Sequence, residues 1–282
     1  MTLPPFSVAD AERWALERAA GLPADPFRLI AFWSVRFLVQ ATPDERKTCY
    51  SMKIAQGETY GRSGGLGPIA DPDPDLVGED GRRILREARW KDAGDRLAIV
   101  DAVIGAVSRP PDAQIVLDES AQAKYVARAE IFADEADRTL RRRDAERSRR
   151  APARVLVVGA SAGIIGALVK RGYDVAATDL SPDVVGRRLG GVLVQDGAEA
   201  NGRLLPGSDL AIITALSLVN GTLPELMRLA KAHGVATMIW AVTARNFGHY
   251  YVDHGVDSVI SDPAPFLLLP GPATIRIWRR PG

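Results

Sequence analysis

The 282-residue sequence predicts an α/β protein in which a doubly wound, mostly parallel sheet follows a smaller N-terminal α/β domain. Its C-terminal half alternates short apolar, β-branched segments with helical or loop segments, as the strands of a parallel sheet do when helices connect them. The expected strands lie near 155–158, 174–178, 191–194, 209–214 and 235–242. The length also fits two domains at roughly 150 residues each. We expect an N-terminal domain over 1–120, a connecting helix over 121–151 and the sheet domain over 152–282.

The first elements are predicted by a helix cap and by composition. Ser7 and Asp10 hold the first and fourth positions of a capping box, which predicts a helix over 8–20. Segment 27–41 is apolar and rich in aromatic and β-branched residues, which favours a strand over a helix. The N-terminal domain is therefore expected to begin with a packing helix and a strand.

Residues 56–74 concentrate glycine, proline and aspartate, which predicts a long loop. Tyr60, Arg62 and Ser63 within it are placed to reach a ligand held by the C-terminal half, although a solvated loop is the plainer interpretation of each. Apolar side chains at helical spacing then predict a helix over 92–107.

The connecting segment mixes charges of both signs. Residues 121–150 end in a run of arginines, which acids interrupt and precede on the same predicted helix. This pattern is typical of a solvated helix. The net charge of +1 also offers too little concentrated positive charge for a large nucleic-acid interface, so we expect no nucleic-acid partner.

The chain ends with two further predicted strands, over 256–261 and 274–278, separated by a proline-rich turn segment. We expect them to form an antiparallel pair at one edge of the sheet. In a doubly wound sheet the ligand lies beyond the carboxyl ends of the strands, so the loops there should converge on one crevice. These loops contain 159–163, Asp179, Asp196, 215–220 and Thr243.

The segment 154–184 has the form of a strand, a glycine-rich turn, a helix and a second strand that ends in an acid. Gly159, Gly163 and Gly166 permit a tight turn, close approach of a ligand and close packing of the helix on the strand. The helix N-terminus offers free N–H groups, and Asp179 can accept hydrogen bonds from ribose hydroxyls. The segment therefore predicts a nucleotide-like ligand, with an ordinary turn that binds nothing as the alternative.

Several later segments follow this turn in a familiar order. They are Asp179-Leu180-Ser181-Pro182-Asp183, 194–198, 205–206, 208–213 and 225–234. Together they resemble class I methyltransferases that use S-adenosylmethionine (SAM). The resemblance implies SAM as the cofactor, with Asp179 on the ribose diol and Asp196 on the adenine. The chain departs from the family at Val157, where an acid is usual, and at Ser161, where a glycine is usual, which leaves open how the methionine end is held.

The cofactor-binding residues predicted on this basis come from four successive loops. They are Gly159, Ala160, Ser161, Gly163, Asp179, Leu180, Asp196, Gly197 and Ala215. A tyrosine ring is expected to stabilise the cationic sulfur, with Tyr50, Tyr60 and Tyr125 as candidates.

A second resemblance is based on 214–223, which contains Leu218-Val219-Asn220-Gly221-Thr222-Leu223, and on 251–261. These segments are similar to a Rossmann-like family labelled "putative heavy-metal chelation". The resemblance implies an N-terminal α/β domain ahead of the Rossmann-like domain, and residues 57–107 fit the end of such a domain. It also leads us to expect an asparagine near the end of the helix over 92–107, where this chain has Gly105.

The histidines do not form an obvious metal site. His249 and His254 are five residues apart, a spacing that points two side chains about 140° apart on a helix. His233 stands at a predicted helix end, where a histidine commonly interacts with the carbonyl end of the helix dipole. We therefore predict no metal ligands.

These patterns lead us to expect an enzyme that binds SAM and acts on a small molecule. It would transfer the methyl group or use the aminocarboxypropyl group, by transfer or by internal cyclisation. The candidate catalytic residues are Tyr60, Ser217 and Asn220, of which Ser217 and Asn220 equally suit the capping of the next helix. The alternative is a non-catalytic protein that binds a metal or metallophore. An NAD-dependent oxidoreductase is third, because the glycine spacing departs from the dinucleotide motif.

Composition limits the partners. No segment approaches the roughly 20 apolar residues that a membrane helix needs, and residues 1–20 lack the apolar core of a signal peptide. We expect a cytoplasmic protein with a small-molecule substrate and no membrane partner, and a homodimer is compatible with the sequence. Cys49 is the only cysteine, so no internal disulfide can form.

Overall fold

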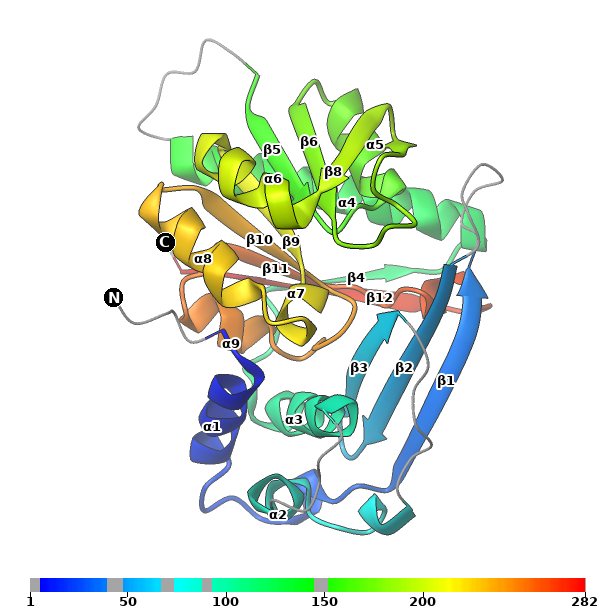
Figure 1. Cartoon of the computed structure of the whole chain (residues 1–282). Coiled ribbons are helices and arrows are strands. Elements are labelled where there is room, and N and C mark those ends of the chain that lie inside the picture. The colour runs from blue at the N-terminus through cyan, green and yellow to red at the C-terminus, as the bar shows by residue number, and fades with distance from the viewer. Residues whose placement is uncertain (1–5, 40–47, 67–73, 88–92, 145–151, 282) are drawn as a thin grey trace.

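A computed structural model describes residues 6–39, 48–66, 74–87, 93–144 and 152–281 (Figure 1). It confirms the α/β class, with one small antiparallel sheet and one large mixed sheet in the described chain. None of the described helices is long and apolar enough to cross a membrane.

The N-terminal part is a three-stranded antiparallel sheet covered by helices. The strands lie in the order β1 (Ala31–Val39), β2 (Thr48–Gln56) and β3 (Tyr60–Leu66). The helices are α1 (Val8–Arg18), α2 (Gly81–Arg86) and α3 (Ala93–Val107). Figure 1 shows α3 between α1 and the strands. A Cβ built on Gly61 of β3 would lie 2.0 Å from the Ala98 carbonyl oxygen, so glycine is what lets α3 pack this closely on the strand.

The second sheet has nine strands within the described residues, in the order β4-β12-β11-β10-β9-β5-β6-β8-β7. Their bounds are β4 (Ala113–Leu117), β5 (Arg154–Val158), β6 (Asp174–Asp179), β7 (Arg188–Leu189), β8 (Val192–Asp196), β9 (Leu210–Thr214), β10 (Ala236–Ala241), β11 (Ser258–Ser261) and β12 (Ala273–Arg279). The six strands from β11 to β8 are parallel, while β12, β4 and β7 pair antiparallel. The parallel strands have the 3-2-1-4-5-6 order of a doubly wound nucleotide-binding sheet.

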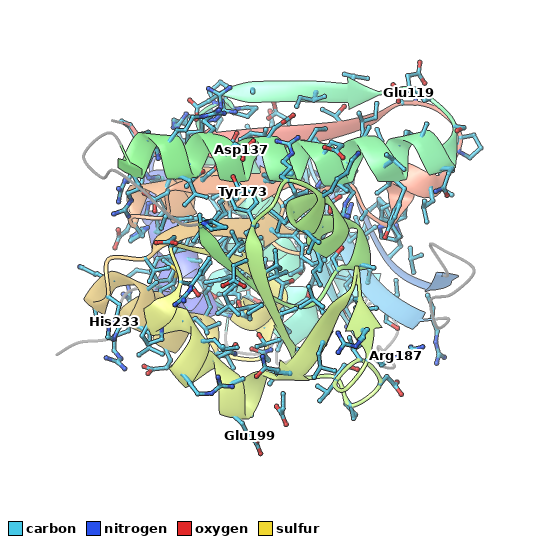
Figure 2. The ribbon with its side chains drawn as sticks, turned by 90° about the horizontal axis from the view of Figure 1, so that it is seen from above. Glu119, Asp137, Tyr173, Arg187, Glu199 and His233 are labelled. Carbon is cyan, nitrogen blue, oxygen red and sulfur yellow. The ribbon has the colours of Figure 1, made fainter. Side chains whose placement is uncertain are left out.

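Helices cover both faces of this sheet. Two lie on one face, α4 (Ala121–Asp144) and α5 (Ala162–Lys170). The other face carries α6 (Gly197–Leu204), α7 (Leu216–Val219), α8 (Leu223–Ala232) and α9 (Gly248–Asp253). Short 3₁₀ turns complete the described elements: η1 (Asp25–Phe27), η2 (Pro74–Leu76), η3 (Leu205–Gly207) and η4 (Phe266–Leu268). Figure 2 shows α4 running along the sheet, where Asp137 accepts a hydrogen bond from the hydroxyl of Tyr173.

Successive residues of the parallel strands enter two separate hydrophobic cores. Val155 and Val157 of β5 face α4 and α5, whereas Leu156 and Val158 face the opposite side. The second of these cores also contains Ala11 of α1 and many residues of α3, so the N-terminal part packs on the large sheet through a shared core. Burial on both faces explains why these strands are continuous apolar runs in the sequence.

Most predicted elements are confirmed. Ser7 and Asp10 form the capping box of α1, α3 ends at Val107 as expected, and each predicted strand of the doubly wound sheet is present. The strand predicted over 27–41 appears as β1. The connecting helix is present over 121–144, and its remainder lies outside the described residues.

Two expectations are corrected. The long loop over 56–74 is wrong for residues 60–66, which form β3, because Gly61 serves close packing of this strand against α3. The pair β11 and β12 is antiparallel as expected, yet it is not the sheet edge, because β4 pairs with the outer side of β12. β4 lies within the range assigned to the N-terminal domain, and the division at residue 120 stays a prediction.

Candidate functional site

The candidate site lies at the carboxyl ends of β5 and β9, where the strand order reverses. β6 and β8 follow β5 on one side, and β10 and β11 follow β9 on the other. Connections leave these two strands in opposite directions, which opens a crevice in doubly wound sheets. Gly159 ends β5 with φ +85°, and a Cβ there would lie 2.5 Å from the Thr214 side chain. Only glycine fits this conformation and spacing, so the turn can lie close against Thr214 at the end of β9.

Asp179 holds the glycine-rich turn in place. One of its carboxylate oxygens accepts a hydrogen bond from the Ala160 N–H at 2.8 Å, and the other accepts one from the Ser181 N–H at 2.8 Å. A carboxylate has about four acceptor positions, so each oxygen keeps capacity for a further donor. Asp179 is half-buried, and it can therefore bridge the protein loop and a ligand hydroxyl.

The turn continues into α5 without a side-chain cap. Ser161 is the N-cap residue, yet its hydroxyl makes no capping hydrogen bond. The first-turn N–H groups of α5 therefore receive no hydrogen bond from the Ser161 side chain, which suits the binding of a polar or anionic group. A Cβ on Gly163 would lie 3.2 Å from the Tyr125 hydroxyl oxygen, so this tyrosine of α4 borders the turn. The side chain of Tyr50, the other distant candidate, lies outside the described residues.

Leu180 and Gly197 form a small apolar surface beside Asp179, which we call the Leu180 and Gly197 shelf. Leu180 is 46% exposed, which is unusual for a leucine next to a buried strand. Gly197 packs beside it, since a Cβ there would lie 3.4 Å from a Leu180 methyl carbon. Asp196 is exposed and caps α6 by accepting a hydrogen bond from the Ala198 N–H at 2.9 Å. The structure thus brings the predicted cofactor-binding residues of three loops together.

The loop after β9 is arranged differently from the prediction. Ala215 is fully buried and packs in the core, so only its backbone borders the crevice. Ser217 is buried, and its hydroxyl donates to the Thr214 carbonyl at 2.6 Å. Asn220 is exposed, and its Oδ1 accepts from the N–H and the hydroxyl of Thr222 just before α8. Asn220 thus orders the turn that precedes α8, whose N-cap makes no side-chain hydrogen bond, and the roles of Ser217 and Asn220 stay predictions.

Tyr60 reaches the same edge from the N-terminal sheet. The Arg62 carbonyl, two residues along β3, accepts hydrogen bonds from the Ala244 N–H at 3.0 Å and the Thr243 hydroxyl at 3.2 Å. The Gly64 N–H donates back to Thr243 at 2.9 Å. β3 is therefore fixed to the loop after β10, and Tyr60 remains 39% exposed beside it.

Asp101 of α3 binds both β3 and the loop after β10. Its buried carboxylate accepts backbone hydrogen bonds from Arg62 at 2.7 Å, Asn246 at 2.7 Å and Arg245 at 3.1 Å. Ala244 adopts φ 51°, a conformation rare for a residue with a side chain, and this turns the next two N–H groups toward Asp101. Burial raises the pKa of Asp101 to about 7 in spite of the three donors.

Gly105, near the end of α3, now has a structural explanation. A Cβ there would lie 2.3 Å from the Thr59 hydroxyl and 2.9 Å from the Asn246 amide nitrogen. Asn246 uses that nitrogen to donate to the Tyr60 and Asp101 carbonyls at 2.8 and 2.9 Å. The Thr59 side chain and the Asn246 amide thus occupy the space that a side chain at position 105 would need.

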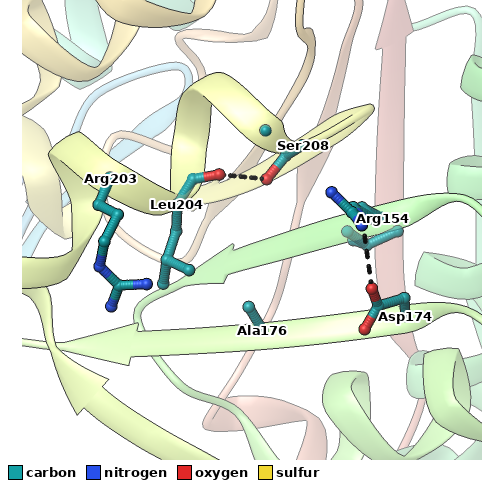
Figure 3. A pocket seen from close by; sticks show the side chains of 8 residues that line it. Arg154, Asp174, Ala176, Arg203, Leu204 and Ser208 are labelled. Carbon is teal, nitrogen blue, oxygen red and sulfur yellow. Dashed lines mark hydrogen bonds and ion pairs between the residues drawn. The ribbon is translucent and has the colours of Figure 1, made fainter.

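A surface pocket of about 270 Å³ lies at the opposite edge of the sheet (Figure 3). Arg154 and Asp174, which line it, are the first residues of β5 and β6. Its walls therefore belong to the amino ends of the strands, away from the glycine-rich turn. Doubly wound sheets bind ligands at the carboxyl ends, so this pocket is not the candidate site.

Among the described residues, no three histidine, cysteine, aspartate or glutamate side chains form a group that could hold a metal ion. His249 accepts a hydrogen bond from the Arg109 N–H at 3.0 Å, and burial lowers its pKa. His254 contacts the Tyr250 carbonyl at 2.7 Å. Both rings are thus engaged in local contacts.

Comparison with known proteins identifies a related family. The model of the family DUF364, described as "Putative heavy-metal chelation", matches residues 144–260. A structure of a DUF364 protein of unknown function from Desulfitobacterium hafniense DCB-2 is 16% identical, with a TM-score of 0.50, and the alignment covers 95% of this chain and 98% of that one. The resemblance to this family is confirmed over the matched residues, and the fold is shared across nearly the whole chain.

Other similarities are weaker. A mandelate racemase/muconate lactonizing protein from Herpetosiphon aurantiacus is 12% identical, with a TM-score of 0.31, over 76% of this chain and 82% of that one. The methyltransferase MycE of the mycinamycin pathway is 16% identical, with a TM-score of 0.25, over 79% and 68%. Scores this low support no functional argument. No curated protein shows significant similarity to the chain.

A neighbouring junction contains residues that the sequence did not single out. Asp101, Arg245, Asn246 and Arg276 lie at the junction of β3 with the loop after β10. They are far apart in the sequence and belong to no recognisable motif. Asp101 could have been noticed in the sequence, because it is a charged residue within the apolar part of the helix over 92–107.

Proposed function

We propose that the chain binds SAM through its adenosyl group at the carboxyl ends of β5 and β6, and uses it to modify a small molecule. The observation behind the proposal is the position of Asp179. It holds the glycine-rich turn through Ala160 and stands beside the Leu180 and Gly197 shelf, at the point where the strand order reverses. This is where doubly wound sheets bind nucleotides.

The residues present suit an adenosyl group. Gly159 leaves bare backbone next to Thr214, and the unfilled acceptor positions of Asp179 suit a ribose diol. The exposed face of Leu180 suits a purine ring, and the carboxylate of Asp196 beside it suits the exocyclic amine. A glycine-rich turn that also carried a middle glycine would favour a pyrophosphate, and here Ser161 takes that place.

SAM supplies a carbon made reactive by the neighbouring positively charged sulfur. The chain itself would need to bind, orient and exclude water, because orientation alone contributes much of the rate in such displacements. Asp179 would orient the ribose, and Tyr125 borders the turn where the methionine end begins. Tyr60, on β3, would approach from the N-terminal sheet, which is fixed to the loop after β10.

A metal-binding function is the second candidate, and the family description supports it. The described residues supply no ready cluster of ligands, and His249 and His254 are engaged elsewhere. We therefore favour the adenosyl ligand.

Thermal unfolding with added ligands separates these functions. SAM or S-adenosylhomocysteine at about 100 times its dissociation constant should stabilise the protein by about 2.7 kcal/mol, or a few degrees for a chain of this size. NADH and divalent metals should have no comparable effect. Asp179→Ala should lose the SAM response while keeping its far-ultraviolet circular dichroism spectrum.

The matched control is Asp174→Ala, which changes an exposed aspartate at the other end of β6. This variant should bind SAM like the wild type. A shift with metal alone, or an Asp179→Ala variant with unchanged SAM affinity, would overturn the proposal.

A further inference from the structure

Three arginines meet at the junction of β3 with the loop after β10. Arg62 comes from β3, Arg245 from the loop and Arg276 from β12. Arg62 is 0% exposed and Arg245 is 3% exposed, while Arg276 is half-buried. Within the described residues, none of the three forms an ion pair with a carboxylate. Buried arginines are normally paired, so this grouping is exceptional.

The three guanidinium groups differ in how well the protein satisfies them. Arg62 donates to the carbonyls of Ala264 and Pro263 at 3.0 Å each, which gives it a structural role. Arg245 makes only two long contacts, from Nε to the Ser261 hydroxyl at 3.3 Å and from Nη2 to the Thr274 carbonyl at 3.5 Å. Its Nη1 contacts no acceptor among the residues that the structure describes.

The hydrogen bonding of the Arg276 guanidinium is also incomplete. Its Nη2 donates to Asn246 Oδ1 at 2.9 Å and to the Ser261 hydroxyl at 3.3 Å. Its Nε is buried without a hydrogen-bond partner in the described chain. Arg245 and Arg276 therefore share Ser261 as a common neighbour and both retain N–H groups that lack acceptors.

The nearby acids Asp262 and Asp101 attract these charges but offset them only in part. Asp262 is buried, but it pairs with Arg128 at 2.5 Å and accepts from Trp240 at 2.7 Å. Asp101 is surrounded by backbone N–H groups, and burial raises its pKa to about 7. Burial lowers the pKa of Arg245 to about 9 and that of Arg62 to about 10, so both remain charged at neutral pH. The junction consequently holds surplus buried positive charge, which is costly unless an anion accompanies it.

An aromatic side chain separates this charge from solvent. The Tyr60 ring lies over Arg245, with the guanidinium carbon 5.1 Å from the ring centre. The ring is 39% exposed, so it forms the boundary between solvent and the arginines.

We propose that Arg245 and Arg276, beneath Tyr60, bind the carboxylate or phosphate group of a small molecule. The free guanidinium N–H groups match the paired oxygens of either anion, and arginine binds such groups through two parallel hydrogen bonds. This inference goes beyond the proposed function and does not depend on it, because Arg245 and Arg276 take no part in the proposed SAM site, and Tyr60 is the residue that the two proposals share.

The test uses the full chain, without SAM, at constant ionic strength set by potassium chloride. Inorganic phosphate and malonate serve as probes of the two anion classes. Each should raise the midpoint of thermal unfolding by several degrees relative to chloride, and the anion with the larger effect identifies the class of ligand. Arg245→Gln and Arg276→Gln remove a charge while keeping a donor, and each should reduce the anion affinity at least about tenfold.

The stability of these variants provides a second readout. Removing an unpaired buried charge should leave the midpoint in chloride unchanged or raise it, whereas loss of a structural arginine would lower it. Arg228→Gln is the matched control, because Arg228 is partly exposed and pairs with Glu225, and it should respond to anions like the wild type.

Two outcomes would overturn the proposal. The first is a response to phosphate and malonate no larger than that to chloride. The second is an unchanged anion response in both Arg245→Gln and Arg276→Gln. A protein that responds to anions but not to SAM would remove the proposed function and leave the anion site standing.

Discussion

The carboxyl edge of the large sheet has two regions of opposite character. At β5, β6 and β8 the loops contain Gly159 and the carboxylates Asp179 and Asp196. At β10, β11 and β12 the same edge is covered by β3 and holds buried arginines. The first region is built from one continuous segment, whereas the second is assembled from both halves of the chain. The first region therefore owes its shape to local turn geometry, and the second depends on how the N-terminal part docks.

The largest expected effect is in the second region. Asp101→Ala leaves three buried backbone N–H groups without an acceptor, and each such loss costs about 1–3 kcal/mol. We expect the free energy of unfolding to fall by about 3 kcal/mol or more in urea titrations at pH 6. The exposed Asp118→Ala should change it by less than about 0.5 kcal/mol. A loss below 1 kcal/mol in Asp101→Ala would show that this carboxylate does not hold the two parts together.

An intermediate loss of stability is expected for substitutions at glycines of positive φ. Two such substitutions separate the cost of backbone strain from the cost of crowding against Thr214. Gly159→Ala and Gly172→Ala both place a side chain at positive φ, +85° and +82°, but only the first also meets Thr214. Strain alone should cost about 1 kcal/mol in Gly172→Ala, and crowding should add about 1–3 kcal/mol in Gly159→Ala. Thermal unfolding of the two variants measures the difference. Equal losses of stability in the two variants would mean that the end of β5 does not need to pack so closely on Thr214 of β9.

The smallest effect is a pH dependence confined to the second region. Asp101 has a folded-state pKa of about 7, above its ordinary value of 3.8, so the folded protein binds this proton more tightly than the unfolded chain does. Its contribution to stability is complete below about pH 4 and is lost as the pH rises through 7. The stability difference between wild type and Asp101→Ala should therefore shrink by about 1 kcal/mol or more between pH 5 and pH 8. A difference that grows with pH would contradict the raised pKa.

The two regions also differ in how well the sequence predicts them. The first follows from local rules, since the strand, glycine turn and acid of 154–184 lie in order and the structure places them as expected. The role of Ser217 was harder to predict. A serine hydroxyl after β9 can bind a ligand or donate to a nearby backbone carbonyl, and in the structure it donates to the Thr214 carbonyl. β3 was missed because glycine, which at position 61 lets α3 pack on the strand, is also typical of loops.

The arginine junction could be predicted only in part, because Arg62 was expected to reach toward the C-terminal half whereas Arg245 and Arg276 were not singled out. Arg62, Arg245 and Arg276 are brought together by docking of the two halves, and no local pattern records that docking. Asp101 stood out in the sequence as an acid within an apolar helical segment. Its partners are backbone N–H groups, however, and the sequence does not show which backbone groups will lie nearby. Long-range placement of this kind depends on the tertiary fold rather than on motif spacing.

The most direct test of the account is a crystal structure of the protein with S-adenosylhomocysteine. We expect the ribose to contact Asp179, the adenine to lie on Leu180 beside Asp196, and the rest of the ligand to follow the backbone of Gly159 to Ser161. Ligand density at the arginine junction alone, with the crevice between β5 and β9 empty, would contradict the central claim that the first region is the nucleotide site.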